Sequence, residues 1–281
     1  MTAAGSGWLG HLRLDYRRDG PRTTALDRHH GPLRVLQRLY PEGEAICHHV
    51  LVHPPGGIVG GDRLEVEAHL APGSHALLTT PGATRFYRSS GPVATQTVRA
   101  RVDDGARLEW LPLETIAYPD CQAENRAVFA LAPAGQMIGM DVLALGLPAA
   151  GAPFDRGVYA QHLELPGAWL ERGRIAGDDA LLLDSPLGLA GHRVLATLWL
   201  AAGAPLGRVP TERLIDCARA LVDASPLAAT AGVTAPDERV VVLRALAAQV
   251  EPAMALLQAV WAAWRPLHWG LAPCPPRVWR L

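Results

Sequence analysis

The chain has 281 residues, a formal net charge of −1 and a hydrophobic fraction of 49%, which are ordinary values for a globular protein. Its 26 basic residues are all arginine, so a Walker-A lysine, a Schiff-base lysine and a Ser-Lys dyad are excluded together. Because arginines and acids are interspersed, nothing indicates a nucleic-acid-binding face. No apolar run approaches the roughly 20 residues of a membrane helix and no signal peptide is evident, so we expect a cytoplasmic protein without a membrane partner.

Alternating apolar and polar residues predict β-strands over most of the chain. Residues 8–18 alternate with the period of a half-buried strand, and 22–28 is expected to return beside it. From 63 to 110, strand-like segments and turn signals recur about every eight to twelve residues in a hairpin-like rhythm, which favours an all-β array over βαβ units. Further strands are predicted at 126–132, 137–145 and 158–165.

The segment 45–53 (AICHHVLVH) is predicted to be a strand that carries several possible metal ligands. His48 falls on the face expected to lie in the core, while Cys47, His49 and His53 share the other face. Same-face neighbours on a strand lie about 6.6 Å apart, so His49 and His53 are about 13 Å apart and cannot close around one ion by themselves. Two interpretations remain open. Cys47, His49 and His53 are separate binding positions for an ion in transit, or they lie on a merely solvated face.

A glycine-rich corner, HPPGGIVGGD (53–62), joins this strand to the next one at 63–70. Glycine permits positive φ and close backbone approach, whereas proline fixes φ, so a tight irregular turn is predicted. The glycines fit neither GxGxxG nor GxxxxGK[ST], which excludes a phosphate-binding loop of either kind. Asp62 leaves the corner with its carboxylate beside open backbone; a rigid turn with a solvated Asp62 is the simpler alternative.

Helical periodicity is found only late in the chain. Residues 210–224 carry an apolar stripe at helical spacing, with Thr211 as the expected N-cap. A second helix is predicted at 252–265, with Pro252 at its first position. Residues 239–247 are ambiguous between strand and helix.

Six segments, in chain order, resemble the UreD (UreH) family of urease accessory proteins. The family is similar in its Gly-Pro-Leu-Arg to Tyr-Pro-Glu stretch and in the glycine-rich corner, whose matching glycines are Gly56, Gly57, Gly60 and Gly61. The other similar segments are TTPGATRFYRS (79–89), which contains Arg85 and Tyr87, LEWLPLETI (108–116), GLAGH (188–192) and the PRVW ending. In the segment LEWLPLETI, Glu114 occupies the position of the family's glutamate.

The resemblance implies a single UreD-like domain over residues 1–281. We therefore expect a mainly β fold with an elongated, β-helix-like stacked-sheet body at about 8–200 and 235–250. Two α-helices, at about 210–224 and 252–265, are expected in the C-terminal part.

The resemblance further implies a urease maturation factor without enzymatic activity. Family members act as a scaffold that binds apo-urease and, through UreF, the GTPase UreG, with a possible dimer through the UreF–UreG complex. Nickel is thought to pass through an internal tunnel, so Ni²⁺ is expected as a transient cargo and no cofactor as a permanent one.

Ni²⁺ accepts imidazole and carboxylate ligands, and a conduit requires few, separated and weak ones. The candidates for lining the nickel path are Asp62, which we rank first as a transient ligand, followed by Glu114, His53 and His49. The alternative is that Asp62 only braces the corner and that Glu114 only pairs with an arginine such as Arg85 or Arg88.

Two positions depart from the family pattern: Leu147 and Pro153 stand where an Arg and a Glu are usual, so any role of those charges is absent or relocated. Two rival functions also stay open. One is a β-helical carbohydrate-active hydrolase that uses Asp62 with Asp120 or Glu124 as paired carboxylates. The other is a plain β-scaffold without metal traffic, which an interior lacking a continuous polar path would favour.

Overall fold

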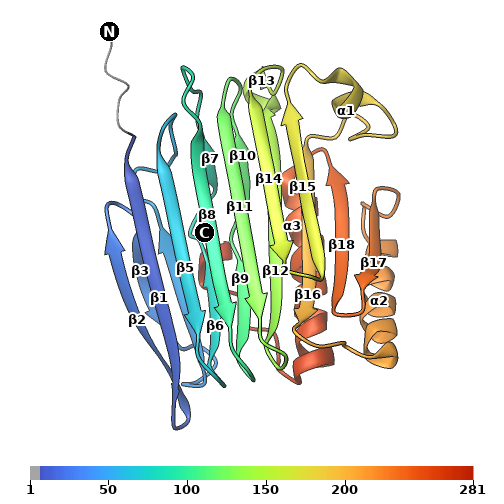
Figure 1. Ribbon diagram of the computed structural model, residues 1–281. Helices are drawn as coiled ribbons and strands as arrows, with labels where there is room; N and C mark the ends of the chain where they lie inside the picture. Colours follow the sequence, from blue (N-terminus) through green and yellow to red (C-terminus); the bar gives the residue numbers. More distant parts are fainter. Residues whose placement is uncertain (1–6, 281) are drawn as a thin grey trace.

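The computed structural model describes residues 7–280, and its β-strands alternate buried and exposed side chains as the sequence predicts. In β1 (Leu9–Asp19), Leu12, Leu14 and Tyr16 are fully buried while their neighbours face outward. Every further strand that repeats this pattern adds its apolar face to the same interior. The result is two large β-sheets stacked face to face (Figure 1).

Within residues 7–280, the first sheet, which we call sheet A, has seven strands. In spatial order they are β15 (Trp169–Ala176), β14 (Val158–Leu165), β11 (Gln122–Leu131), β8 (Ala94–Val102), β5 (Arg63–Leu70), β1 and β2 (Arg22–His30). β15 and β2 are therefore the two edges of sheet A.

The second sheet, sheet B, has eleven strands in the same part of the chain. Its main path is β17 (Ala231–Asp237), β18 (Val240–Ala247), β16 (Val194–Ala202), β12 (Gln136–Leu147), β9 (Arg107–Leu111), β6 (His75–Thr79), β4 (Ile46–Val52) and β3 (Arg34–Leu39). The short strands β7 (Thr84–Phe86), β10 (Thr115–Ala117) and β13 (Ala152–Pro153) pair beside it. The ambiguous segment 239–247 is thus a strand.

Neighbouring strands in the middle of both sheets are parallel. β5, β8, β11 and β14 pair in parallel in sheet A, as do β4, β6, β9 and β12 in sheet B. Each turn therefore carries the chain to the opposite sheet and not back along the same one, so the hairpin-like rhythm of the sequence marks a β-solenoid of about four turns. The prediction of a β-helix-like stacked-sheet body is confirmed.

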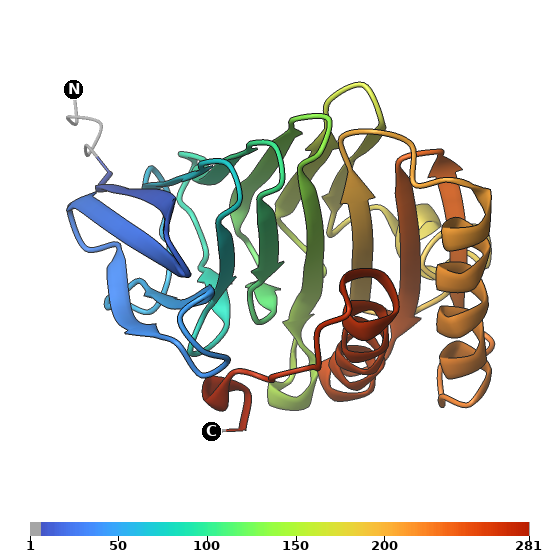
Figure 2. The same cartoon turned by 90° about the horizontal axis from the view of Figure 1, so that it is seen from below.

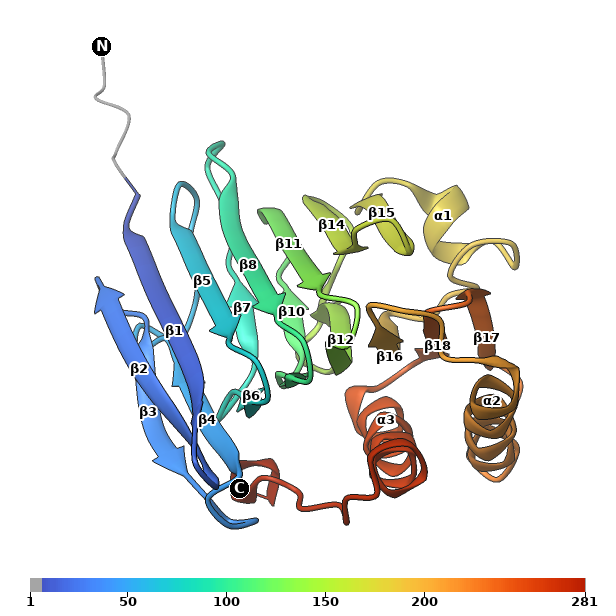
Figure 3. The same cartoon turned by 60° about the horizontal axis from the view of Figure 1, so that its bottom comes forward.

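The hydrophobic core has one layer between the sheets and another outside sheet B. Between the sheets, the rings of Phe129 and Trp169 each lie 5.7 Å from that of Trp199. On the outer face of sheet B, α3 packs against β16 and β12 (Figure 3). The buried residues of α3 in this layer include Trp261 and Trp264. The indole N–H of Trp264 donates to the carbonyl of Leu214, which joins α3 to α2.

The two C-terminal helices are α2 (Arg208–Asp223) and α3 (Val250–Trp264), within two residues of the predicted bounds. Their starts were predicted wrongly: Thr211 donates its hydroxyl to the Gly207 carbonyl from inside the helix, and Pro252 is the third helical residue. Proline is tolerated throughout the first turn because the N–H it lacks has no intrahelical partner there. The sequence also missed α1 (Ala180–Asp184), whose single turn is too short for a periodic signal.

Short helical turns complete the structure: η1 (Pro148–Ala150), η2 (Arg265–Trp269), which is a π-helical turn, and η3 (Arg277–Arg280). From α3 the C-terminal segment runs back beneath the first strands of the chain (Figure 2). Across residues 7–280, none of the helices combines the length and the apolar character needed to cross a membrane.

Candidate functional site

The glycine-rich corner is held by the Asp62 carboxylate. One oxygen accepts the backbone N–H of Trp8 at 2.8 Å, and the other accepts that of Val59 at 3.1 Å. Asp62 is only 9% exposed, so both hydrogen bonds are shielded from water. The alternative of a solvated turn residue is therefore wrong, and Asp62 does brace the corner.

The corner packs against the segment that contains Arg85 and Tyr87. The backbone N–H of Ile58 donates to the Arg85 carbonyl at 2.7 Å, and the N–H of Tyr87 donates to the Ile58 carbonyl at 2.9 Å. A Cβ atom on Gly57 would lie 2.0 Å from the Tyr87 ring, so this position requires glycine for close approach.

The other glycines of the corner serve backbone conformation and contact. Gly56 and Gly61 have φ of 78° and 91°, in the left-handed region that glycine adopts readily. A Cβ atom on Gly60 would lie 2.1 Å from the Ser89 hydroxyl. Each of the four glycines therefore serves either a backbone conformation or a close contact. The glycine spacing in the sequence predicted a tight turn but not these individual contacts.

A cavity of about 310 Å³ lies beside this corner, between the two sheets. His53, Gly56 and Gly57 line it from the corner, and Arg85 lines it from the segment that packs there. Gln96 reaches it from β8 in sheet A. The cavity therefore has a mostly apolar wall with a few polar groups, which is typical of a ligand-accessible space.

His53 is half-buried in the wall of this cavity. Burial lowers the pKa of its imidazole, while the nearby Asp62 charge acts in the opposite direction. His53 and Asp62 are thus close enough to interact electrostatically, and a neutral imidazole is the form that can bind a metal ion.

His49 is enclosed between the sheets and both of its ring nitrogens are engaged. Nδ1 lies 2.7 Å from the Tyr16 hydroxyl, and Nε2 lies 3.1 Å from Nε of Arg38. Because arginine can only donate, Nε2 must accept and the imidazole must be neutral. Burial and the Arg38 charge lower the His49 pKa to about 4. The solvated-face alternative is therefore wrong for His49.

Cys47 and Glu114 are the remaining candidate ligands. The Cys47 thiol is buried, and burial raises its pKa to about 11. Glu114 is half-buried, and its backbone carbonyl accepts the N–H of Thr84. Within residues 7–280 no ion pair joins Glu114 to Arg85 or Arg88, so that alternative is not seen.

A row of polar side chains crosses the interior between the sheets, and the sequence analysis missed it. From sheet A, Gln96 donates to Asn125 at 3.2 Å. Asn125 and Gln161 then donate to the Asp141 carboxylate of sheet B at 3.4 and 2.7 Å. The buried Thr197 lies beside Asp141 in the register of β16. We call these five residues the inner polar layer.

The inner polar layer begins at the cavity, because Gln96 belongs to the layer and also lines the cavity. Asp141 is its only carboxylate, and burial raises the pKa of that group to about 6, although the Gln161 hydrogen bond opposes the shift. The Tyr159 hydroxyl, fully buried on the same inner face as Gln161, makes no hydrogen bond to the described residues 7–280. A free hydroxyl beside a half-buried carboxylate leaves bonding capacity for a water molecule or a cation.

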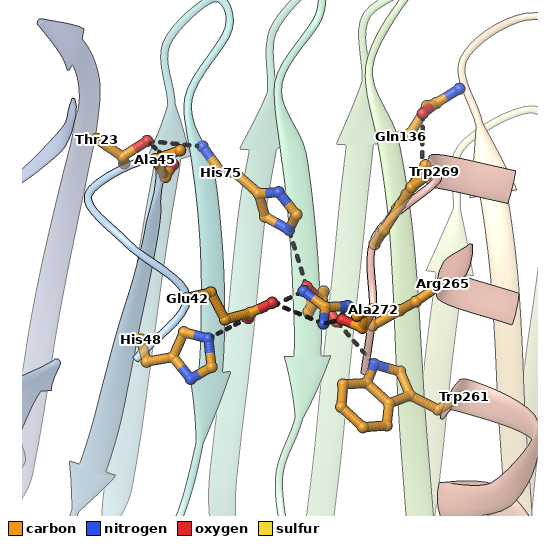
Figure 4. Close-up of polar contacts among 11 residues, drawn as sticks. Thr23, Glu42, Ala45, His48, His75, Gln136, Trp261, Arg265, Trp269 and Ala272 are labelled. Carbon is orange, nitrogen blue, oxygen red and sulfur yellow. Dashed lines mark hydrogen bonds and ion pairs between the residues drawn. The ribbon is translucent and has the colours of Figure 1, made fainter. Parts of the chain in front are cut away.

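A second buried polar cluster lies on the outer face of sheet B (Figure 4). The fully buried Arg265 guanidinium lies between Glu42 and Glu109, with contacts of 2.9 to 3.2 Å. His48 contacts Glu42 at 2.7 Å and His75 contacts Glu109 at 2.8 Å. Each carboxylate thus has an arginine and a histidine partner, and His48 is buried as its predicted face required.

The charges within this cluster compensate one another. Burial would raise the pKa of Glu109, but the His75 hydrogen bond and the Arg265 charge outweigh it, so that pKa is lowered. The Trp261 indole N–H adds a hydrogen bond to Glu109 at 2.7 Å. Because the guanidinium fills the space between the carboxylates, this cluster holds the C-terminal segment on the sheet.

The two positions that depart from the family pattern are close together. Leu147 pairs with Ala152, and Gly146 pairs with Pro153, where β12 and β13 form a hairpin. Pro153 is exposed and Leu147 is half-buried. The two positions therefore lie on adjacent rungs of one hairpin with their side chains on opposite faces, and both are apolar here.

The fold and the site define a β-solenoid protein with an enclosed polar interior and a helical outer layer. The family model described as "UreD urease accessory protein" matches residues 9–280. The chain therefore belongs to the UreD family of urease accessory proteins. This confirms the resemblance read from the sequence.

Individual relatives agree with the family match. The urease accessory protein UreD of Leptothrix cholodnii is 67% identical over 275 residues, covering 97% of this chain and 99% of that protein. The urease accessory protein UreD of Paracidovorax citrulli is 57% identical, covering 98% of this chain and 99% of its own length. That of Variovorax paradoxus is 56% identical, covering 97% and 99%.

Proposed function

We propose that this chain is a non-catalytic urease maturation factor that passes Ni²⁺ to apo-urease through the inner polar layer. It binds apo-urease on one side and, through UreF, the GTPase UreG on the other. Nickel is a transient cargo in this scheme and no cofactor is held permanently.

The observation that carries the proposal is the continuity of polar groups from the cavity to Gln161. A dehydrated cation in an apolar interior is strongly disfavoured unless polar groups replace its water. The layer supplies amide oxygens and one carboxylate at Asp141, and the Tyr159 hydroxyl lies on the same inner face as Gln161. One carboxylate among neutral groups binds a divalent cation weakly, which suits transit better than storage.

The predicted path residues fit this scheme unequally. His53 lies in the cavity wall and presents an imidazole where an ion would first meet the layer. Asp62 acts near His53 as a source of negative potential, while it braces the corner. His49 has no free ring nitrogen, so it contributes only by supporting the wall. Glu114 is a further candidate next to the segment that contains Arg85.

The hydrolase alternative finds less support. Asp62 has both oxygens bound by backbone amides, and Asp120 is paired with Arg156 at 3.2 Å. Glu124 is exposed on the outer face of sheet A. A glycosidase needs two carboxyl groups facing one cleft about 5–10 Å apart. Hydrolysis of a glycoside by the purified chain would revive this alternative.

The test is urease activation with the complete set of accessory proteins. The Asp141→Asn variant keeps the size of the side chain and removes the only charge of the layer. We expect normal assembly with UreF and UreG and a fall in the nickel content of urease of about tenfold, equivalent to about 1.4 kcal/mol of added barrier. Glu124→Gln, next to Asn125 but facing outward, is the matched control and should behave as wild type. Normal nickel content with Asp141→Asn would refute the proposed path.

A further inference from the structure

The inner polar layer does not end in packed side chains on its far side. In sheet A, the strand after β14 is the edge strand β15, where Gly173 lies opposite Gln161. Gly173 is exposed, and a Cβ atom placed on it would meet no other atom within 4 Å. The row of Gln96, Asn125 and Gln161 therefore runs into open space.

The polar row of sheet B also ends at an exposed glycine. The row that contains Asp141 continues through Thr197 and Arg244 to Gly232 on the edge strand β17. Gly232 is also exposed, and a Cβ atom there would again meet nothing within 4 Å. Both sheets thus present a glycine where their polar rows reach the same edge of the sandwich.

An ion pair spans the two sheets beside these glycines. The guanidinium of Arg244, in sheet B, lies 2.5 Å from the carboxylate of Glu171, on β15 in sheet A. The side chains are 57% and 30% exposed, so the pair lies at the boundary between the interior and the solvent. The Glu171 oxygen that makes the contact is itself buried, so the guanidinium is the member of the pair that has room to move away.

We propose that this edge is the second mouth of the inner polar layer and that the Arg244–Glu171 pair closes it. The inference rests on the proposed function: a divalent cation that enters at the cavity beside the glycine-rich corner leaves here, or travels in reverse. The Tyr159 hydroxyl lies on the strand next to β15, two residues from Gln161, and makes no hydrogen bond within residues 7–280, so it has bonding capacity for such an ion.

Charge and space at the mouth fit a gate for a cation. Arg244 repels a cation and Glu171 attracts it, so an ion passes only when the guanidinium swings away and the carboxylate stays. The exposed Arg244 side chain has solvent to swing into, whereas Glu171 is the more enclosed of the two. The glycines keep the opening free of side chains, and neither has a positive φ that would itself require glycine.

The experiment fills the mouth with a large side chain. In Gly173→Trp we expect normal assembly with UreF, UreG and apo-urease, together with a fall in urease nickel content of about tenfold. Leu170→Trp is the matched control, because Leu170 is on the same strand but exposed on the outer face. Gly232→Trp plugs the mouth from the other sheet and serves as a second variant should Gly173→Trp fold poorly.

The outcomes separate this inference from the proposed function. If both tryptophan variants deliver nickel as wild type does while Asp141→Asn fails to, the conduit stands and the mouth is refuted. If Asp141→Asn also delivers nickel normally, the conduit itself is wrong. Loss of delivery in Leu170→Trp equal to that in Gly173→Trp would indicate a docking surface on β15 in place of a mouth.

Discussion

Arg265 and Glu42 are 223 residues apart in the sequence, yet two hydrogen bonds of 2.9 and 3.0 Å join their side chains. The first belongs to the π-helical turn after α3 and the second to the loop between β3 and β4. This pair ties the end of the chain to its beginning, across the outer face of sheet B.

Arg265→Ala should strongly destabilise the protein. It leaves the Glu109 and Glu42 carboxylates enclosed without their cation, and breaking a buried pair in this way costs about 3–5 kcal/mol. Chemical denaturation measures the free energy of unfolding. Arg208→Ala breaks an exposed i,i+4 pair with Glu212 and should change stability by less than about 0.5 kcal/mol. Equal losses in the two variants would contradict the structural role of Arg265.

His49 should make the folded state less stable in acid. Its folded pKa of about 4 lies below the ordinary 6.5, so the unfolded state binds the proton first as pH falls. Stability from this group is complete above pH 6.5 and declines through the window down to pH 4, by about 3 kcal/mol at 1.36 kcal/mol per unit. His49→Gln should remove this dependence, as urea titrations at several pH values would reveal.

Asp141 should act in the opposite direction. Its folded pKa of about 6 lies above the ordinary 3.8, so the folded state binds the proton first. The carboxyl group therefore destabilises the folded state as pH rises through the window from 3.8 to 6. Asp141→Asn should consequently gain stability relative to wild type above pH 6 and not below pH 4. A pH-independent difference between the two proteins would show that Asp141 titrates normally.

Gly57→Ala should destabilise the glycine-rich corner through one contact. The new methyl group would lie 2.0 Å from the Tyr87 ring, and overpacking of this kind costs about 1–3 kcal/mol. In a Tyr87→Ala background the same change should cost far less, since the ring is gone. Gly82→Ala is the control, because a Cβ atom there meets nothing within 4 Å.

Asp62→Ala tests whether Asp62 serves nickel transfer beyond its bracing role. Loss of its two hydrogen bonds to backbone amides should lower stability by about 1–2 kcal/mol. If bracing is its whole role, nickel content of urease should fall in step with the yield of the complex with UreF and UreG. A fall in nickel content at undiminished complex yield would establish a direct role in the path.

The strands and late helices were predictable because they depend on local periodicity. Parallel pairing was not, since a turn of given composition does not reveal whether the chain returns to its own sheet or crosses to the other. Thr211 and Pro252 were misplaced for a related reason: several first-turn positions suit them equally.

The corner was predictable because glycine and proline act locally, whereas the polar interior is assembled by register between distant strands. A signal was nevertheless present. Gln96, Asn125 and Gln161 each interrupt the apolar face of a strand that is otherwise regular. One such interruption is uninformative, and only the solenoid register places the three beside one another. The Arg265 cluster carried no comparable pattern.

The Arg265 cluster also bears on how the chain is made. Ribosomes synthesise the N-terminal strands first, so Glu42 and Glu109 emerge long before the cation that neutralises them. Until Arg265 leaves the exit tunnel, the outer face of sheet B carries two uncompensated acids and lacks its helical cover. The native contacts of this face are therefore completed late, and a nascent chain that stops short of Arg265 remains recognisable to proteases as unfinished.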